Sequence, residues 1–473
     1  MTAATPEERC LYVNAHTGGY EFFPSPKREL HADQRCAWRI SPEPFWLDQQ
    51  TYAFFEQLGD YLLAFYRAAN RLYQHSRRGL QPSWVAEYLE AGKPERVIEY
   101  GVMKRFRADL PVIIRPDVIL TSEGPVITEL DSLPGGIGLC GYLNQVYAEL
   151  GFEVVGGAQG MVNGFRDAVF GAAGRPGAVL GIVVSDESAD YRPEMTWLGE
   201  KLRCQGLKVY NLAPEDVHYR EDALYVEGPA GRERLDILYR FFELFDLKNI
   251  PKIDLILYAI RKEQVKVTPP LKSYLEEKML LAFLHHPRLS SFWEQELGSE
   301  GLALLRRVVP MTWIIDDRPV PPYAVIPGLE LDGRPVADWN ELKRATKRQR
   351  RLVLKPSGFS ELAWGARGVV IGHDHPQEVW ARALDKALQN WRSGPYILQK
   401  FHKGARFKVR YYDFWQRRLC ALTGRVRLTP YYFVCEGQTR LGGIMATVTP
   451  LNKKLIHGMT EAVMAPVAVR RGD

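Results

Sequence analysis

Residues 112–136 read VIIRPDVILTSEGPVITELDSLPGG, and this stretch determines most of what the sequence predicts about the fold. Its two apolar runs, Val112–Leu120 and Val126–Leu130, are rich in β-branched residues, as strands are. Between them lies Ser122-Glu-Gly-Pro125, a sequence typical of a turn. The stretch therefore predicts a β-hairpin.

Three carboxylates of this hairpin are expected to lie together. Residues two apart on a strand point to the same face, which places Glu129 beside Asp131, and Asp117 lies on the partner strand. Clustered carboxylates repel one another unless a cation lies between them, and Mg²⁺ prefers such oxygen ligands. The sequence thus predicts a magnesium site; the alternative is an acidic strand edge in water. The glycine-rich Leu133–Gly138 that follows is either a loop that approaches a ligand or an ordinary strand-to-helix turn.

The rest of the chain alternates between helical and strand patterns. Leu47–Gln74 carries apolar residues at helical spacing, which predicts a long amphipathic helix. From Ala178 onward strand, helix and strand alternate, which predicts a small parallel sheet. The strands of this sheet are Val179–Val184, Leu207–Leu212 and Ile237–Phe242, and its helix is Tyr191–Cys204. Further on we expect helices at Leu271–His286 and Pro376–Trp391, a Pro-rich linking segment at Val309–Gly328, and strands at Arg351–Lys355, Val369–Gly372, Tyr396–Phe401, Phe407–Phe414, Leu419–Leu428 and Tyr431–Cys435.

Two C-terminal segments suit a phosphorylated ligand. Lys355 ends an apolar strand, where its ammonium can meet phosphate charge, and the small residues of Gly358–Gly368 let backbone N–H groups fold over phosphates. The apolar strand Tyr396–Phe401 can offer backbone amides to an adenine edge. Taken alone, Lys355 is equally a solvated lysine, and the strand is more often part of a core.

Composition narrows the class of protein. With 473 residues, of which 46% are hydrophobic and 25% charged, the chain is expected to form two or three lobes of a soluble globular protein. The net charge of +6 suits an anionic ligand such as a nucleotide, but it is too small and too dispersed for a nucleic-acid-binding protein. The cysteines are scattered, the polar N-terminus is unlike a signal peptide, and no long apolar run is present. The sequence predicts a cytoplasmic protein without a membrane span.

In their order along the chain, these segments resemble the circularly permuted ATP-grasp ligases, which include the eukaryotic-type glutathione synthetases and the glutathionylspermidine synthetases. In that group an Arg-x-Asp strand and a Glu-x-Asn strand precede the ATP lysine, as Arg115-Pro-Asp117 and Glu129-Leu-Asp131 precede Lys355 here. The resemblance implies an α/β (α+β) protein with a circularly permuted ATP-grasp fold, an inserted Rossmann-like substrate domain and a lid. It implies a helical region with the metal-binding hairpin at 1–170, the substrate domain at 171–262 and the nucleotide-binding part with the lid at 263–473.

The resemblance also assigns roles to residues of this chain. Arg115 is the catalytic candidate, and Asp117, Glu129 and Asp131 are the magnesium ligands. ATP is expected to contact Lys266, Lys355, Ser357, Gly358, Gly365, Gly368, Gln399, Lys400 and Phe401. Candidates for substrate binding are Arg240, Arg425, Arg427, Arg440, Gly442 and Gly443, although the last three arginines are equally suited to a solvated surface.

The implied activity is an ATP- and Mg²⁺-dependent, ADP-forming ligation of a carboxylate to an amine through an acylphosphate. Asp131 stands where the group has Asn, the lid lacks the group's Arg-Glu-Gly-Gly-Gly run, and Glu361 is the nearest lid carboxylate. The substrates, small molecules or peptides, therefore stay open. The alternatives are an ATP-grasp small-molecule kinase and an inactive ATP-binding protein, and a homodimer is the expectation for assembly.

Overall fold

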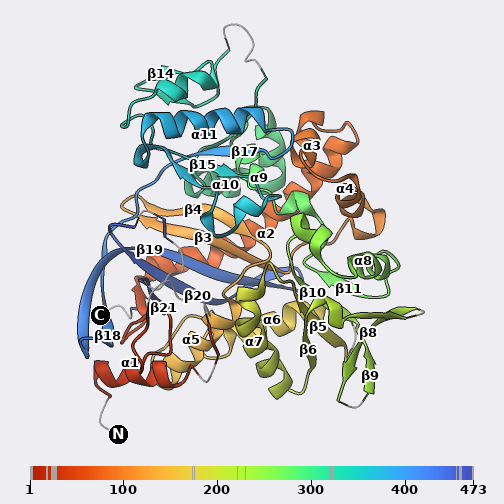
Figure 1. Cartoon of the computed structure of the whole chain (residues 1–473). Helices are drawn as coiled ribbons and strands as arrows, with labels where there is room; N and C mark the ends of the chain where they lie inside the picture. Colours follow the sequence, from red (N-terminus) through yellow and green to blue (C-terminus); the bar gives the residue numbers. More distant parts are fainter. Residues whose placement is uncertain are drawn as a thin grey trace.

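A mainly antiparallel sheet, built from both ends of the chain, lies at the centre of the molecule (Figure 1). The computed structural model describes residues 4–17, 20–22, 29–172, 174, 176–220, 222–229, 231–318, 324–453, 455–456 and 461–470, without the side chains of 364–366. The strand order is β1-β21-β20-β19-β3-β4, and β18 and β2 pair with β19 and β21. The strands are β1 Arg39–Ile40, β2 Phe45–Leu47, β3 Ile113–Thr121, β4 Gly124–Asp131, β18 Phe407–Asp413, β19 Arg418–Cys435, β20 Gln438–Pro450 and β21 Val463–Val469.

The predicted hairpin is confirmed as β3 and β4, at the edge of this sheet. In its antiparallel register Arg115 lies opposite Asp131, and Asp117 lies opposite Glu129. The C-terminal strands differ from the prediction in one respect. Tyr431–Cys435 is part of the same long strand β19 as Leu419–Leu428, with an irregularity in pairing at Tyr431/Tyr432. The strand continues through Thr429 and Pro430, which pair with Met445 and Ile444 of β20.

The predicted parallel sheet is also confirmed, with the order β11-β10-β5-β6. Its strands are β5 Val179–Val184, β6 Lys208–Leu212, β10 Ile237–Phe241 and β11 Lys266–Thr268. The fourth strand, β11, was not predicted, because three residues are too short to show a strand pattern. A small antiparallel sheet lies beside it, made of β7 His218–Arg220, β8 Ala223–Gly228 and β9 Gly231–Arg234.

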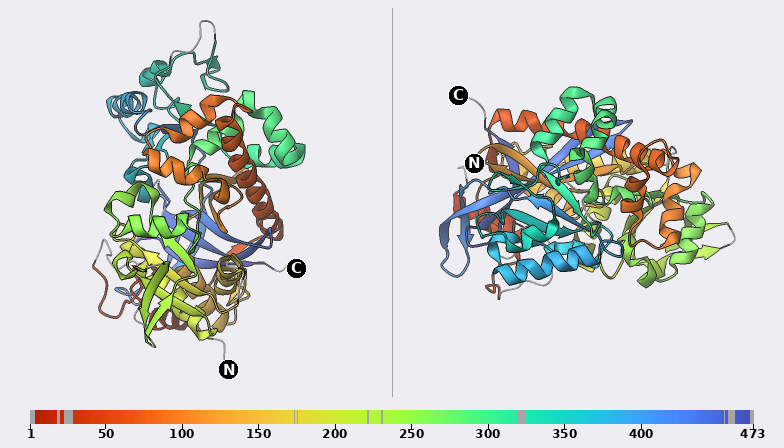
Figure 2. Two further views of the ribbon diagram at one scale, coloured as in Figure 1. Left: turned by 90° about the vertical axis from the view of Figure 1, so that its right-hand side faces the viewer. Right: turned by 90° about the horizontal axis from the view of Figure 1, so that it is seen from above.

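A further antiparallel sheet, covered by α11, lies above the hairpin in Figure 1, and the parallel sheet lies below it; Figure 2 shows the same arrangement from the side. Its order is β12-β17-β15-β16, with β12 Thr312–Ile315, β15 Leu352–Pro356, β16 Val370–Ile371 and β17 Tyr396–Lys400. β12 falls inside the segment predicted as a proline-rich link, because its four residues are flanked by prolines that masked the strand signal. A short ladder pairs β13 Glu330–Leu331 with β14 Arg334–Pro335.

Helices cover these sheets. They are α1 Pro6–Ala15, α2 Gln49–Arg77, α3 Ser83–Glu90, α4 Glu95–Val102, α5 Ile137–Glu149, α6 Gly160–Gly171, α7 Arg192–Cys204, α8 Ile253–Arg261, α9 Met279–His285, α10 Ser290–Val308 and α11 Gln377–Gln389. The 3₁₀ helices are η1 Lys104–Phe106, η2 Ala189–Tyr191, η3 Pro214–Asp216, η4 Leu244–Asn249, η5 Ser273–Leu275, η6 Pro287–Leu289, η7 Trp339–Arg344, η8 Glu361–Ala366 and η9 Gly372–Asp374. The long helix predicted at Leu47–Gln74 is α2, whose N-terminus is capped by Asp48.

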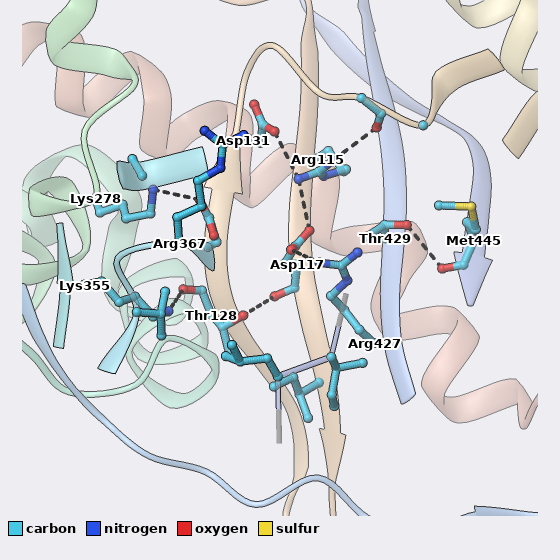
Figure 3. A pocket seen from close by; sticks show the side chains of 18 of the residues that line it. Arg115, Asp117, Thr128, Asp131, Lys278, Lys355, Arg367, Arg427, Thr429 and Met445 are labelled. Atoms are coloured by element: carbon cyan, nitrogen blue, oxygen red, sulfur yellow. Dashed lines mark hydrogen bonds and ion pairs between the residues drawn. The ribbon is translucent and has the colours of Figure 1, made fainter. Parts of the chain in front are cut away.

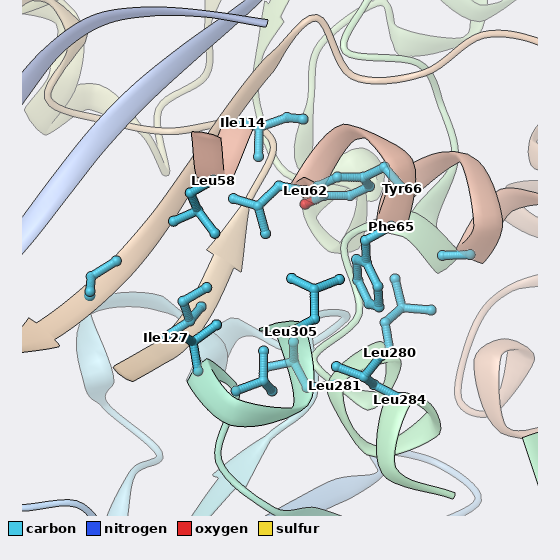
Figure 4. Packing of buried hydrophobic residues seen from close by; sticks show 14 of the residues in the cluster. Leu58, Leu62, Phe65, Tyr66, Ile114, Ile127, Leu280, Leu281, Leu284 and Leu305 are labelled. Carbon is cyan, nitrogen blue, oxygen red and sulfur yellow. The ribbon is translucent and has the colours of Figure 1, made fainter. Parts of the chain in front are cut away.

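One hydrophobic core joins α2, α9 and α10 to the outer side of the hairpin (Figure 4). Leu58, Leu62 and Phe65 recur at helical spacing on α2 and are almost fully buried. Each such side chain contributes roughly 1.5–3 kcal/mol by leaving water. This packing fixes the hairpin from behind, so that its polar side faces away from the core.

The helix predicted at Leu271–His286 is broken, with η5 and α9 separated by Glu276-Glu277-Lys278. These three side chains bind to three different parts of the molecule, and these contacts hold the backbone out of a continuous helix. The predicted domain boundary at 262/263 stays a prediction, and the parallel sheet continues beyond it to Thr268 in β11. None of the described helices is long and apolar enough to cross a membrane.

Candidate functional site

A cavity of about 440 Å³ is lined by residues of the hairpin β3–β4, the sheet β15–β17, the strands β19–β20 and the start of α7 (Figure 3). Predicted residues that line it are Arg115, Asp117, Glu129, Asp131, Lys355, Gln399, Lys400, Phe401 and Arg427. Further charged residues on its wall are Glu187, Asp190, Glu194, Glu243, Lys278 and Arg367. The lining combines these charges with apolar side chains of β15–β17, as a site for an amphipathic ligand does.

Two arginines meet at Asp117 on the floor of the cavity. Arg115 Nη2 lies 3.2 Å from Asp117 Oδ1 and 3.0 Å from Asp131 Oδ2, and Arg427 Nη1 donates to Asp117 Oδ2 at 2.8 Å. Arg115 Nη1 also donates to the carbonyl of Gly135 at 3.1 Å. The Nε atoms of both arginines are buried and have no hydrogen-bond partner among the described residues. Both arginines therefore keep donor capacity that the protein itself does not use.

Two lysines face the same cavity from the other side. Lys278 pairs with Glu129 at 2.8 Å, while Lys355 donates to the carbonyl of Thr128 and to Gln399 Oε1, both at 2.9 Å. Burial lowers the pKa of Lys355 to about 8. Burial alone would raise the pKa of Glu129, but Lys278 and Lys355 lower it below its ordinary value. Glu129 is thus ionised at neutral pH, and the positive charges of Lys278 and Lys355 lie beside it.

The hairpin carboxylates do not form the three-membered metal cluster that the sequence predicts. Among the residues that the structure describes, no group of three or more His, Cys, Asp or Glu side chains could hold a metal ion. The reason is Arg115, whose guanidinium lies between Asp117 and Asp131, and both oxygens of Asp117 face arginines. Glu129 and Asp131 keep 34% and 31% of their side chains exposed. Since Mg²⁺ is commonly held by one or two carboxylates plus phosphate oxygens and water, these two residues fit such an ion and Asp117 does not.

Glu194 of α7 lies at the inner end of the cavity, where it caps α5. Its carboxylate accepts hydrogen bonds from the backbone N–H groups of Gly136 at 2.6 Å and Leu139 at 3.3 Å. The left-handed Gly136 (φ 88°) starts α5, and a Cβ on Gly135 would lie 2.1 Å from the Tyr191 ring. The glycine-rich turn thus serves close packing. Burial raises the pKa of Glu194 to about 7, although the backbone N–H groups of Gly136 and Leu139 and the charge of Arg115 act to lower it.

Several predicted ligand contacts lie away from the cavity. Lys266, predicted to reach ATP, is half exposed on β11 and pairs with Asp109 at 3.1 Å. Arg240, predicted to bind substrate, is fully buried and pairs with Glu276. Lys266 and Arg240 both lie on strands of the parallel sheet. The guanidinium of Arg240 is covered by the carbonyl groups of Pro269 and Pro270 and by the carboxylate of Glu276.

Of the other substrate candidates, Arg427 lines the cavity and the rest are placed elsewhere. Arg425 donates to the carbonyl of Leu451 at 3.1 Å, and Arg440 forms a surface ion pair with Asp167 at 2.6 Å. Gly442 and Gly443 are buried in β20 under α6, where a Cβ on Gly442 would lie 2.4 Å from the Phe433 ring. These two glycines therefore allow a helix to approach the sheet closely.

The segment after Lys355 is folded onto the protein. Ser357 and Gly358 donate to the Glu277 carboxylate, and neither residue lines the cavity. Gly365 belongs to η8, and its surroundings lie outside the described side chains. Gly368 packs on Pro356, and Glu361 is exposed on η8. In this arrangement Pro356, Ala363 and Arg367 of the segment line the cavity, and Arg367 lies 3.6 Å from Glu187.

Lys278, Glu194 and Arg367 were missed by the sequence analysis. Lys278 and Glu194 lie within helical patterns, where a charged residue is normally a solvated one. Arg367 stands between the glycines of the predicted lid, and that position was the available signal.

No protein-family model matches the chain, and no curated protein matches it. A solved structure of a glutathione synthetase-like effector from Globodera pallida superposes with a TM-score of 0.57 at 12% identity, over 99% of this chain and 98% of that one. A Methylobacillus flagellatus protein assigned provisionally as a gamma-glutamylcysteine synthetase has a TM-score of 0.40 at 12% identity, over 86% of this chain and 85% of that one. The chain therefore has a mixed α/β fold of the kind seen in the glutathione synthetase-like effector.

Proposed function

We propose that the protein is an ATP-dependent ligase of the circularly permuted ATP-grasp type, which joins a carboxylate to an amine and releases ADP and phosphate. The observation that carries this proposal is the convergence on one cavity of Arg115, Arg427, Lys278 and Lys355, from four separate segments, beside two partly exposed carboxylates. Four cations beside partly exposed carboxylates suit a polyanion that binds together with a divalent cation, and the apolar strand ends next to Lys355 favour a ligand with a flat, apolar part. A nucleoside triphosphate has both properties.

Each residue has a task in this proposal. Lys278 and Lys355 neutralise the triphosphate from one wall of the cavity. Glu129 and Asp131 would hold Mg²⁺, which would stabilise negative charge on the transferred phosphoryl group. Arg115 and Arg427, oriented by Asp117, bind the carboxylate that accepts the phosphoryl group. The amine then attacks the acyl carbon of the acylphosphate, phosphate leaves and the amine gives its extra proton to water. The resulting product is an amide.

A paired-substrate experiment tests the proposal. Amino acids, small peptides and amines are supplied in pairs with ATP and Mg²⁺, and ADP release and product mass are measured together. A ligase releases ADP only when both an acid and an amine are present, and the product mass equals their sum minus water. Release of ADP with a phosphorylated single substrate would instead indicate a kinase.

A further inference from the structure

Glu276, Glu277 and Lys278 are consecutive, yet each side chain binds a different part of the molecule. Glu276 pairs with Arg240 of the parallel sheet, and Lys278 pairs with Glu129 of the hairpin. Glu277, between them, pairs with Lys93 in the turn between α3 and α4. This tripeptide therefore joins the helical region, the parallel sheet and the cavity.

Glu277 is the most completely enclosed of the three. Its side chain is 0% exposed and that of Lys93 is 1% exposed. Its second oxygen accepts hydrogen bonds from the Ser357 hydroxyl and from the Gly358 backbone N–H, the latter at 2.9 Å. Lys93 Nζ also donates to the carbonyl of Leu89 at 2.6 Å and lies 5.6 Å from the centre of the Phe359 ring. Both partners of this buried pair thus contact the segment 357–359.

The contact fixes two backbones that carry the cavity lysines. Lys278 directly follows Glu277, and Lys355 lies two residues before Ser357. A Cβ on Gly358 would lie 2.0 Å from the Glu276 carbonyl, so the two backbones approach as closely as glycine allows. A change in this contact would move Lys278 and Lys355 relative to each other.

We propose that Glu277 is a positioning residue for the nucleotide, which sets the separation of Lys278 and Lys355 by holding Ser357 and Gly358 against the residues that precede α9. The role rests on the proposed function, in which both lysines bind the triphosphate. A buried ion pair stabilises a fold no better than apolar side chains of the same volume, so stability alone does not account for Lys93 and Glu277. The two directional hydrogen bonds that Glu277 accepts from Ser357 and Gly358 instead fix the position of the segment after Lys355.

A pair of double variants separates positioning from packing. Lys93→Met/Glu277→Gln removes the ion pair but keeps an oxygen for Ser357 and Gly358, whereas Lys93→Met/Glu277→Leu removes the ion pair and the acceptor. Two quantities are measured on the full chain: hydrogen exchange of the Gly358 amide, and the Kd for ATP with Mg²⁺ by calorimetry. We expect the Leu variant to exchange about 10-fold faster and to bind ATP about 10-fold more weakly than the Gln variant.

Equal exchange and equal affinity in the two double variants would overturn the proposal and leave Glu277 a packing residue. Faster exchange without any ATP binding by the wild type would support the contact but contradict the proposed function, so the two failures are distinguishable. If the Leu variant does not fold, Ser357→Ala leaves the ion pair intact. Faster exchange at Gly358 in that variant supports the proposal, and unchanged exchange overturns it.

Discussion

Arg115 and Arg240 both lie on strands and were both predicted to contact a ligand, but the structure gives them opposite environments. Arg240 is fully buried: its Nε donates to Pro269 at 3.0 Å, and its other nitrogens donate to Phe242 at 2.9 Å, to Pro270 at 3.1 Å and to Glu276. Arg115 keeps an Nε without a partner among the described residues and 14% of its side chain exposed. The comparison shows that a strand arginine predicted to bind a ligand can instead have every guanidinium nitrogen bound by its own protein, as Arg240 does.

The largest effect is expected at Arg240. Arg240→Met leaves Glu276 buried without its cation, so the free energy of unfolding should fall by about 3–5 kcal/mol in urea denaturation. Arg240→Met/Glu276→Leu is the matched control, and it should recover most of the loss. A folded Arg240→Met variant that keeps its stability but loses ligand binding would contradict this prediction, because it would show that Arg240 binds the ligand and does not stabilise the fold.

Arg115 should show the opposite behaviour. In Arg115→Met the charge of Asp117 is still paired with Arg427, so the fold is kept, but the donor for the reacting group is lost. Turnover, measured as ADP release with the acid and amine that the paired-substrate experiment finds, should fall about 10²–10³-fold. Arg440→Met, on the surface, is the control and should retain turnover; equal turnover of both variants would contradict the role of Arg115.

The pH dependence of stability tests the burial of Glu194. Its pKa is raised from 4.5 to about 7, so the folded protein favours the protonated form. The stability linked to this group is complete below pH 4.5 and is lost as pH rises to 7. Between these values the unfolding free energy of the wild type should fall by on the order of 3 kcal/mol relative to Glu194→Gln, followed in urea at several pH values. A constant difference between the two proteins would show that the pKa of Glu194 is the same in the folded and the unfolded state.

A smaller effect is expected from two lysines, Lys278, which the sequence analysis missed, and Lys266, which it predicted to contact ATP. Lys278→Met should weaken ATP binding about 10-fold to 100-fold, because a charge-assisted contact to phosphate is lost. Lys266→Met should leave the affinity within about twofold, since Lys266 contacts Asp109 outside the cavity. Calorimetric titration of both variants measures this, and a larger loss in Lys266→Met would restore the original assignment.

Much of the fold was predictable because it follows from local patterns of apolar residues. The hairpin, the long helix α2 and the strands β5, β6 and β10 each carry enough regularly spaced apolar residues to be identified. The short strands β11 and β12 were missed because three or four residues do not define a period. The break before α9 is caused by contacts of Glu276, Glu277 and Lys278 with distant segments, which a local pattern does not contain.

The site was predictable where residues of one hairpin meet, and not where distant segments meet. The neighbourhood of Arg115, Asp117, Glu129 and Asp131 follows from strand register alone. What the register could not show is that Arg115 lies between Asp117 and Asp131 and pairs with both. Lys278, like Glu194, enters the cavity through tertiary packing.

The central claim is that ATP binds in the cavity between the hairpin and the sheet β15–β17, and calorimetric titration of the wild type and Lys355→Met with ATP and Mg²⁺ at pH 7 tests it most directly. At this pH Lys355, with its pKa of about 8, is protonated. We predict that the wild type binds one ATP per chain and that Lys355→Met binds at least about 10-fold more weakly. Absence of ATP binding by the wild type, or equal affinity in Lys355→Met, would contradict the account.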